Sequence, residues 1–586
     1  MQQRTLLTPP TPPTEEEREF YYYGLPSRPI LIARSSTQAW VDPQMPGTLN
    51  MCPRVLQPVG EHPLLHQLWN NAASSLRAQI LQAVSAADWT AVDILRVGLN
   101  GELHITLMVA VKPGTLSWSD GYAIAMECKS IFEAHNIHGV DCEIRESLVN
   151  FCRDFTAEST AESTTERPAT FQLSSAPILD GMVYAEHWAD MSDCLGTKIA
   201  MKHMDDRSGT KGLYLSLQAS STTGEPKLLA LTCRHVVIDS KTEGLEKYSR
   251  QELGNSKDVI QIDQPTYLET INYMRKKAKG ARNYAKQYTD RGNTDYAASF
   301  TKVAKTATTL RRAMEPFVSP SSRVFGQLLF SPELACITDP SRGSNWLRDW
   351  ALIELLPECH QAPLCSIQNK VYVGPEDDFE RLLTKQKGGL EGFLIPDMPI
   401  VDGCIELKED VVTMDEILSP SQNSEHFNTP MLPVMKYGAK GGLTLGLGNT
   451  LVSILRHTET PDGDREMMSE EWAIVPIEKA NNEYQAAFST KGDSGSCVWD
   501  MKRRPAGILS AGASQNRLND ITCRNSSSIM WRVPFRHIAF CIGLNARDWS
   551  PKYMVHLGND LCYYHCPSAI IDRGCWIANL DLSFLV

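Results

Sequence analysis

The sequence contains no apolar run of the length that a bilayer crossing requires. Its first residues are rich in proline and threonine and then acidic, and they lack the apolar core of a secretory signal. Acidic residues outnumber basic residues by 69 to 57, so the formal net charge is −12. An acidic chain is poorly suited to the phosphate backbone of nucleic acids. We therefore expect an intracellular protein, cytoplasmic or nuclear, with no membrane partner and no nucleic-acid partner.

Clustered metal ligands and nucleotide loops are missing too. The 16 cysteines are scattered, which is typical of reduced thiols rather than of a disulfide framework. No Gly-x-x-x-x-Gly-Lys-Ser/Thr loop is present to hold a nucleotide phosphate. Zinc needs two well-spaced ligand pairs, and the C-terminal tail lacks a clear second pair. Its candidates are His556, Cys562, His565, Cys566 and Cys575. We expect ordinary reduced cysteines here, no metal and no cofactor.

The composition that remains is that of a globular protein, with 42% hydrophobic and 22% charged residues. A chain of 586 residues exceeds one ordinary core, so several units are expected. Shifts in composition divide the chain into five segments. These are a disordered leader (1–20), a small α+β domain (21–155), a linker rich in Ser, Thr and Glu (156–170), a mainly β domain (171–545) and a C-terminal tail (546–586).

The segment 21–155 alternates between helical and strand patterns. Apolar residues recur at helical spacing over 65–80, and a second helix is expected up to Phe132. Strands are expected at 94–97, 105–111 and 141–149. Such a unit can cover its apolar faces and fold alone. Because it carries no recognisable chemistry, we interpret it as a docking or regulatory module for a protein partner.

The pattern of short strands expected over 171–545 is interrupted at 246–318. Two runs of apolar residues at 4-3 spacing, separated by Arg291-Gly292-Asn293, predict an antiparallel helical hairpin. Its outer faces are basic, so the hairpin either presents a solvated surface or binds a protein partner, and the solvated surface is the more common case. The basic residues are Arg275, Lys276, Lys277, Lys279, Arg282 and Lys286.

The motif Gly492-Asp493-Ser494-Gly495 is the strongest chemical signal. Glycines allow backbone angles that side chains forbid and leave room for a substrate carbonyl. They also let the N–H groups of Gly492 and Ser494 point at one place, where an oxyanion would form. The motif alone is equally compatible with a surface turn, because turns are rich in these residues.

Two further residues complete a candidate triad. A serine hydroxyl needs a base within hydrogen-bond reach, and histidine suits that role because its pKa lies near the working pH. A buried carboxylate then orients the histidine. His235 ends an apolar strand and Asp349 begins another. Each residue alone is more often structural, but the order His, Asp, Ser with Ser494 on the glycine turn favours catalysis.

These residues resemble those of the trypsin-like serine peptidases. Leu231 to Val237 resembles the family's strand ending in Thr-Ala-Ala-His, 349–353 its Asp-Ile-Ala-Leu-Leu, and 492–495 its nucleophile motif. The resemblance implies a multidomain chain whose main part is a chymotrypsin-like double Greek-key β-barrel, with the helical hairpin inserted and the α+β domain before it. The glycine-rich 435–446 resembles the hairpin that opens the second barrel. The whole chain also resembles large multidomain fungal proteins that carry such a domain.

The resemblance further implies an oxyanion hole at Gly492 and Ser494. It places Ser510, Ala511 and Gly512 on a strand that pairs with the substrate backbone. It places Phe488 at the base of the primary specificity pocket, so no carboxylate would await a basic side chain there.

Two departures from the family pattern are visible. No cysteine directly follows His235, so the disulfide usual beside that histidine is absent. Asp493 also lacks an obvious cleavage site to supply the N-terminus that pairs with this aspartate in secreted relatives.

Two hypotheses from different classes remain. The first is a serine endopeptidase that cleaves polypeptides through an acyl-enzyme. The second is a scaffold or signalling protein whose peptidase-like domain binds peptides at a latent or inactive site. The complete triad favours the enzyme, because loss of any member would cost orders of magnitude in rate.

Overall fold

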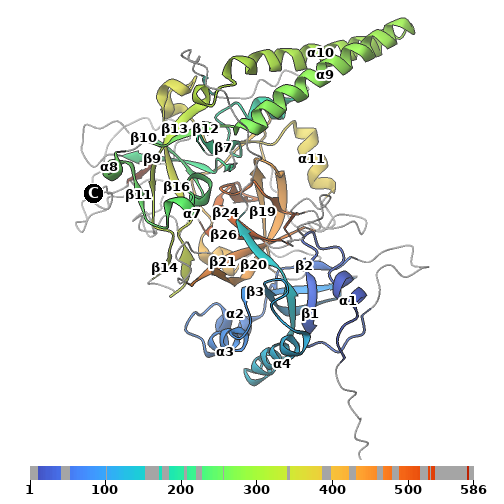
Figure 1. Cartoon of the computed structure of the whole chain (residues 1–586), viewed down its shortest axis with the longest axis vertical. Helices are drawn as coiled ribbons and strands as arrows, with labels where there is room; N and C mark the ends of the chain where they lie inside the picture. The colour runs from blue at the N-terminus through green and yellow to red at the C-terminus, as the bar shows by residue number, and fades with distance from the viewer. Residues whose placement is uncertain are drawn as a thin grey trace, which may run out of the picture.

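A computed structural model of the whole chain shows a multidomain, mixed α/β protein built on two large, mostly antiparallel sheets (Figure 1). The structure describes most of the chain, with gaps. The described residues are 11–40, 53–99, 102–151, 171–174, 184–203, 207–218, 227–254, 256–339, 343–385, 398–420, 430–457, 466–477, 487–514, 526–527, 530–534 and 577–579. Within them, none of the helices combines the length and apolarity that spanning a membrane takes. The expected linker 156–170 and the cysteines and histidines of the tail lie outside the described residues.

The N-terminal segment forms an α+β layer in which helices pack on one face of a sheet (Figure 1). Both expected helical regions and all three expected strands are present, although the first helical region is split in two. The strand expected over 141–149 is also split, since β5 ends at Glu146 and a second short strand begins at Leu148. The elements are α1 Glu15–Phe20, β1 Ile30–Arg34, β2 Val55–Gln57, α2 Pro63–Trp69, α3 Ser75–Val84, β3 Trp89–Leu99, β4 Glu102–Val111, α4 Trp118–Ala134, β5 Asp141–Glu146 and β6 Leu148–Phe151.

The expected disordered leader is wrong over its second half. Residues 15–20 form helix α1, whose N-terminus is capped by the side chain of Thr14 and carries acidic residues in its first turn. Glu17 forms an ion pair with Arg34 of β1 at 2.9 Å, so the helix is tied to the sheet. The tyrosines that follow it, Tyr21 and Tyr22, are buried and both donate hydrogen bonds to Glu143.

The N-terminal layer is also not the separate domain that the sequence suggests. Its strand β3 pairs with β20 of the region beyond residue 430, so β1, β5, β4 and β3 extend one 12-stranded sheet. Buried polar contacts fix the junction. Asn449 accepts the N–H of Val59 at 3.0 Å and donates to the carbonyl of Ile94 at 2.9 Å. Trp69 donates to the carbonyl of Val452 at 2.8 Å. The two regions therefore share backbone and side-chain bonds that neither could satisfy alone.

Six further strands of the 12-stranded sheet form a ring, and the short strands β2 and β6 join the sheet through β3 and β24. The pairings run β20–β19–β23–β24–β26–β21, and β21 pairs back with β20. Among these strands, β19 and β20 form the hairpin that was expected at 435–446, and β24 contains Ser510, Ala511 and Gly512, which were expected on a strand. The ring consists of β19 Leu432–Gly438, β20 Gly442–His457, β21 Met467–Pro476, β23 Cys497–Asp500, β24 Pro505–Ser514 and β26 Met530–Pro534.

The second large sheet has nine strands and does not close among the described residues, so the expected pair of closed barrels is not shown. Its path ends at β8, a strand of two residues, and the Thr210 N–H of β8 donates instead to the Ser494 carbonyl of the other half at 2.7 Å. The strand β27, the three described residues of the expected tail, pairs with β9 at the edge of this sheet. The strands are β7 Lys198–Met201, β8 Gly209–Thr210, β9 Leu213–Gln218, β10 Lys227–Thr232, β11 Tyr248–Ser249, β12 Asp258–Gln261, β13 Val324–Ser331, β16 Ala351–Leu355 and β27 Ile577–Asn579.

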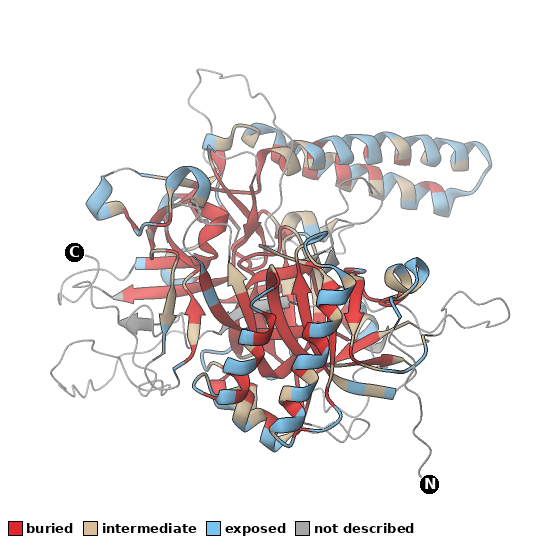
Figure 2. Cartoon of the chain, turned by 60° about the horizontal axis from the view of Figure 1, so that its bottom comes forward, coloured by how far each residue is buried: buried red, intermediate tan, exposed pale blue. Residues whose placement is uncertain are grey.

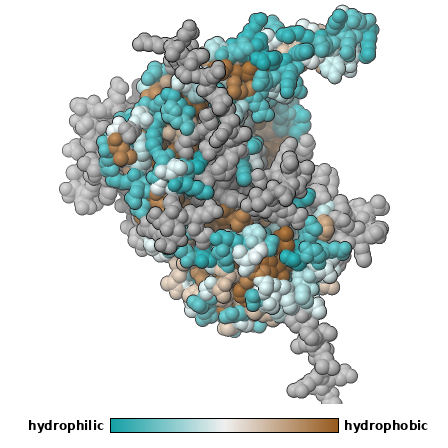
Figure 3. Space-filling view, viewed as in Figure 1, coloured by the Kyte–Doolittle hydropathy of each residue, from teal (hydrophilic) through white to brown (hydrophobic). Residues whose placement is uncertain are grey.

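The expected helical hairpin is present but shorter than 246–318. It consists of α9 Gln264–Asp290 and α10 Thr294–Met314, joined at Gly292 (φ +73°). Residues 248–261 contribute β11 and β12 to the nine-stranded sheet, where β12 lies between β13 and β7. The hairpin projects from the body, with buried residues only along its inner seam (Figure 2). Its outer surface is hydrophilic (Figure 3).

Short elements connect these parts. The helices are α5 Ala185–Ala189, α6 Arg234–Val237, α7 Ser240–Glu243, α8 Arg250–Leu253, α11 Glu376–Lys385 and α13 Met414–Leu418, with single 3₁₀ turns at Glu315–Phe317, Pro320–Arg323, Pro357–Cys359 and Leu364–Ser366. Three two-stranded sheets pair β14 Cys336–Thr338 with β15 Asn345–Leu347, β17 Lys370–Tyr372 with β18 Cys404–Glu406, and β22 Ser489–Thr490 with β25 Ser526–Ser527.

We predict that Asn449→Ala lowers the free energy of unfolding by roughly 3 kcal/mol, because it leaves several buried backbone groups without a partner. Asn71→Ala, at an exposed position of the same layer, is the matched control and should change it by less than about 0.5 kcal/mol. Urea unfolding followed by tryptophan fluorescence measures both. Equal effects of the two substitutions would contradict a shared, interlocked junction.

Candidate active site

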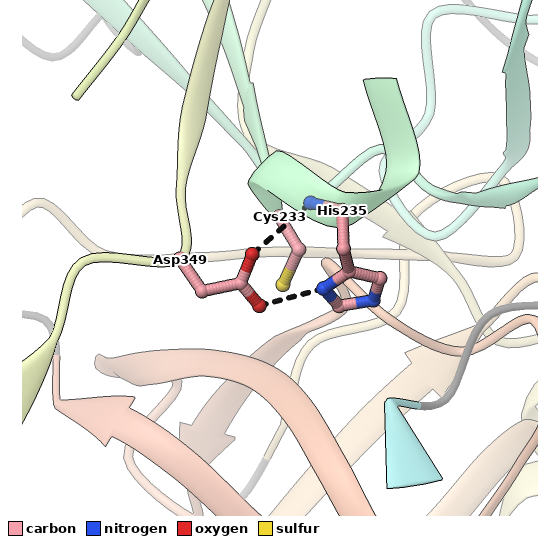
Figure 4. Close-up of side chains that lie close together, drawn as sticks. All are labelled: Cys233, His235 and Asp349. Carbon is pink, nitrogen blue, oxygen red and sulfur yellow. Dashed lines mark hydrogen bonds and ion pairs between the residues drawn. The ribbon is translucent and has the colours of Figure 1, made fainter. Parts of the chain in front are cut away.

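His235, Asp349 and Ser494 lie in contact at the junction of the two large sheets. The Nδ1 of His235 is 2.6 Å from Oδ2 of Asp349, and its Nε2 is 2.7 Å from Oγ of Ser494. The backbone N–H of His235 also donates to Oδ1 of Asp349 at 3.0 Å. Figure 4 shows both oxygens of the carboxylate turned toward the histidine. All three side chains are buried.

The strand pairing explains why two of these residues meet. β10 and β16 are antiparallel neighbours, with Thr232 opposite Ala351. The chain leaving β10 therefore emerges beside the chain entering β16. One helical turn, α6, then turns His235 toward Asp349, which lies two residues before β16. The third residue, Ser494, comes from the turn before β23 of the other sheet.

Arg234 fixes the same turn from the other side. Its guanidinium is buried and donates to the Ser331 hydroxyl and to the carbonyls of Pro332, Gly244 and Glu246. Burial lowers the pKa of Arg234 to about 10, which still leaves it charged at neutral pH. The residue was not singled out from the sequence, because an arginine beside the histidine gives no sign of being buried.

The electrostatics favour an ionised Asp349. Burial alone would raise the pKa of its carboxyl, but the charge of His235 and the hydrogen bonds from it outweigh burial, so the pKa lies below the usual 3.8. Two neighbours favour their neutral forms. Burial raises the pKa of Glu471 well above its usual range, and burial lowers the pKa of His457 to about 4 despite the charge of Asp349. His457 therefore adds no charge beside the pair at neutral pH.

The turn that carries Ser494 is built on glycine. Gly492 and Gly495 have φ values of +98° and +89°, which side chains rarely adopt. A Cβ on Gly495 would also lie 2.3 Å from Oγ1 of Thr232. Among the described residues, the N–H groups of Gly492 and Ser494 have no hydrogen-bond acceptor. Both are therefore available to an oxygen of a bound molecule.

A buried lysine, Lys436, forms an ion pair with Asp493, the residue before Ser494. Asp493 is fully buried, and its Oδ2 lies 2.7 Å from Nζ of Lys436 and accepts the N–H of Thr490. Its Oδ1 accepts the N–H groups of Lys440 and Gly441. The β19–β20 hairpin thus supplies a cation to Asp493 without a free N-terminus. This answers the departure noted in the sequence, and Lys436 is a residue that sequence reasoning missed.

Thr210 of β8 links the two sheets at the same turn. Its N–H donates to the Ser494 carbonyl, and its hydroxyl donates to the Gly492 carbonyl at 2.9 Å. The hydroxyl also accepts the N–H of Ala439 at 3.1 Å. One threonine therefore bonds both ends of the Gly492–Ser494 segment. Nothing in the spacing of the sequence distinguishes it from other strand threonines.

Cys233 completes the only group of three potential metal ligands among the described residues, together with His235 and Asp349 (Figure 4). Their donor atoms lie within 4.8 Å of one another. However, Nδ1 of His235 is already bonded to Asp349, and the Cys233 thiol donates to the Leu509 carbonyl at 3.1 Å. The geometry is that of a satisfied hydrogen-bond network, so we assign no metal to it.

The residues expected to bind substrate lie in two places. Ser510, Ala511 and Gly512 are on β24, and the Ser510 carbonyl is 3.2 Å from Oγ of Ser494. Phe488 is fully buried in a core cluster against Gly446 and near the Lys436 ammonium. Its role at the base of a pocket stays a prediction.

The arrangement can perform one kind of chemistry well. A carboxylate on Nδ1 keeps the histidine proton there, so Nε2 is free to accept the proton of the Ser494 hydroxyl. The oxygen then becomes nucleophilic toward an electrophilic carbon, and two backbone N–H groups lie on the same turn. Comparison with family models and with curated proteins found no match. The chemistry therefore has to be judged from the site alone.

We predict that Lys436→Met lowers the free energy of unfolding by about 3–5 kcal/mol, because it leaves the Asp493 charge buried and unpaired. The double variant Lys436→Met, Asp493→Asn should recover part of that loss. Lys440→Met, at the exposed tip of the same hairpin, is the control and should cost less than about 0.5 kcal/mol. Urea denaturation distinguishes these outcomes. A loss in Lys436→Met no larger than that of the control would show that the ion pair does not hold the turn.

We also predict a pH dependence from Asp349. Because its folded pKa lies below the unfolded 3.8, the carboxylate stabilises the fold above pH 3.8 and loses this effect as pH falls through the folded value. The stability difference between the natural chain and Asp349→Asn should therefore be constant near neutral pH and shrink in acid. Denaturation curves of the two chains are measured at each pH. Subtracting one free energy of unfolding from the other removes the acid sensitivity that the two chains share. A difference that grows in acid would contradict the ionised pair.

Proposed function

We propose that the chain is a serine endopeptidase with Ser494 as nucleophile, His235 as general base and Asp349 as the residue that orients His235. The observation that carries the proposal is the continuous line of short contacts, 2.6 Å from Asp349 to Nδ1 and 2.7 Å from Nε2 to the serine oxygen. Such contacts are within the range that proton transfer requires. The three side chains are buried, so the hydrogen bonds between them are stronger than they would be in water.

In the proposed reaction, Nε2 of His235 takes the proton of Ser494 as the serine oxygen attacks a peptide carbonyl. The carbonyl oxygen becomes an oxyanion, which accepts hydrogen bonds from the N–H groups of Gly492 and Ser494. The imidazolium, stabilised by the Asp349 carboxylate, gives the proton to the leaving amine, and the C–N bond breaks. Water then attacks the acyl-enzyme by the same route, which releases the carboxylic acid and restores the serine.

The arrangement of the sheets supports the finer proposal of a chymotrypsin-like fold. Histidine and aspartate come from the nine-stranded sheet, and the nucleophile comes from the six-stranded ring. Lys436 takes over the role that a newly formed N-terminus has in secreted relatives, because it brings a buried positive charge to Asp493. On this proposal the site needs no N-terminal cleavage to form its oxyanion turn, and its preferred substrate residue is not basic.

We predict that a fluorophosphonate probe labels the natural chain at Ser494 and that Ser494→Ala abolishes the labelling. Asp349→Asn should slow it by about 10⁴-fold, because the histidine then lacks its proper tautomer. Ser130→Ala, which removes an exposed hydroxyl on α4, is the control and should label at the natural rate. Gel fluorescence over time measures the rates, and peptide mapping identifies the modified residue. Labelling of neither the natural chain nor the control would favour the scaffold hypothesis.

A further inference from the structure

The short strand β6 lies on the same edge of β24 as the nucleophile turn. β26 takes one edge of β24 over Gly507–Gly512. Three partners follow one another on the other edge of β24. Strand β23 pairs with the N-terminal part of β24. The nucleophile turn comes next, where the Gly495 N–H donates to the Leu509 carbonyl and the Leu509 N–H donates to the Ser496 carbonyl. β6 then pairs with Ala511–Ser514.

The direction of β6 places its C-terminal end near Ser494. The pairing is antiparallel, with Leu148 opposite Ser514 and Phe151 opposite Ala511. The neighbour of Ala511 is Ser510, whose carbonyl is 3.2 Å from the Ser494 hydroxyl oxygen. The C-terminal end of β6 is therefore the end that approaches the nucleophile. An extended polypeptide that presents a carbonyl to Ser494 and pairs with β24 would use this same edge.

The N-terminal layer holds β6 in place. Ser147, directly before β6, donates its N–H to the Val111 carbonyl at 3.0 Å and accepts the Thr90 hydroxyl at 3.1 Å. Val149 packs against the main core. On the opposing strand, Ala513 is fully buried, so the edge is not open to solvent. Since β3 is bonded to β20, the layer that delivers β6 is itself fixed to the ring.

We propose that β6 is a built-in inhibitor strand, which occupies the place of an extended polypeptide substrate on β24 and must leave before another polypeptide can bind. The inference rests on the proposed peptidase function, since it concerns regulation of that site. Strand addition of this kind gains its affinity from backbone hydrogen bonds, so it tolerates many side chains. The N-terminal layer thereby acquires a function, because it positions the strand that occupies the substrate-binding edge of β24.

Peptide binding to the inactive, full-length Ser494→Ala chain tests the proposal without any need for catalysis. The probe is a fluorescein-labelled peptide that copies Ser147 together with β6 (Ser-Leu-Val-Asn-Phe). Val149→Pro and Asn150→Pro are each added singly to the Ser494→Ala chain. Neighbouring N–H groups along a strand point to opposite sides, so only one of the two prolines removes a bond to β24 and the other is its matched control. Fluorescence anisotropy gives the dissociation constants.

We predict that one proline variant binds the peptide about tenfold more tightly than the Ser494→Ala parent, because a lost ladder bond frees the edge, and that the other resembles the parent. No gain in either variant, or an equal gain in both, would overturn the proposal. Hydrogen exchange of the parent chain gives a second test that needs no substitution in β6. Excess peptide should speed exchange of the amides of 148–151 while those of 511–513 stay protected, and unchanged exchange of 148–151 would contradict displacement.

The fluorophosphonate experiment separates this inference from the proposed function. The probe is small and does not require β24, so its labelling rate should be the same with and without the proline. Labelling of Ser494 without a gain in peptide binding would overturn the inhibitor strand alone. A gain in peptide binding without labelling would overturn the peptidase and leave a peptide-binding site controlled by β6.

Discussion

The two-point hold of Asp349 on His235 is the interaction on which the rest of the site depends. One carboxylate oxygen accepts the backbone N–H of His235 and the other lies against the ring, so both the position and the orientation of the imidazole are fixed. A buried carboxylate is stable only when it is fully bonded. The antiparallel neighbours β10 and β16 make this possible, because they bring the two residues to one end of the same sheet.

The other half of the site is fixed by a second buried charge. Lys436 and Asp493 hold the glycine turn, and Thr210 ties that turn to the nine-stranded sheet. The serine is thus positioned by contacts from both sheets, while the N-terminal layer continues the 12-stranded sheet and brings β6 to β24. Three segments far apart in the sequence therefore meet along one strand edge. On the two proposals made above, the reaction and access to the site depend on the same few backbone contacts.

The sequence predicted the parts of this structure that depend on side-chain pattern. Apolar runs located β10 and β16, the helical seam located α9 and α10, and local context identified the residues that meet at the site. It did not predict the pairing of β3 with β20 or of β6 with β24, since edge pairing uses backbone groups that every residue has. Lys436 was missed for a related reason, because a lysine in a strand is usually exposed.

The proposed mechanism requires that Ser494 forms a covalent acyl intermediate with the help of His235. The burst of leaving group released from an activated ester before steady turnover begins measures that intermediate. We expect a burst of about one equivalent per chain, as acyl-enzyme accumulation requires, and none from a chain that lacks the serine hydroxyl. Release that is linear from the first moment, or a burst that persists without that hydroxyl, would contradict it.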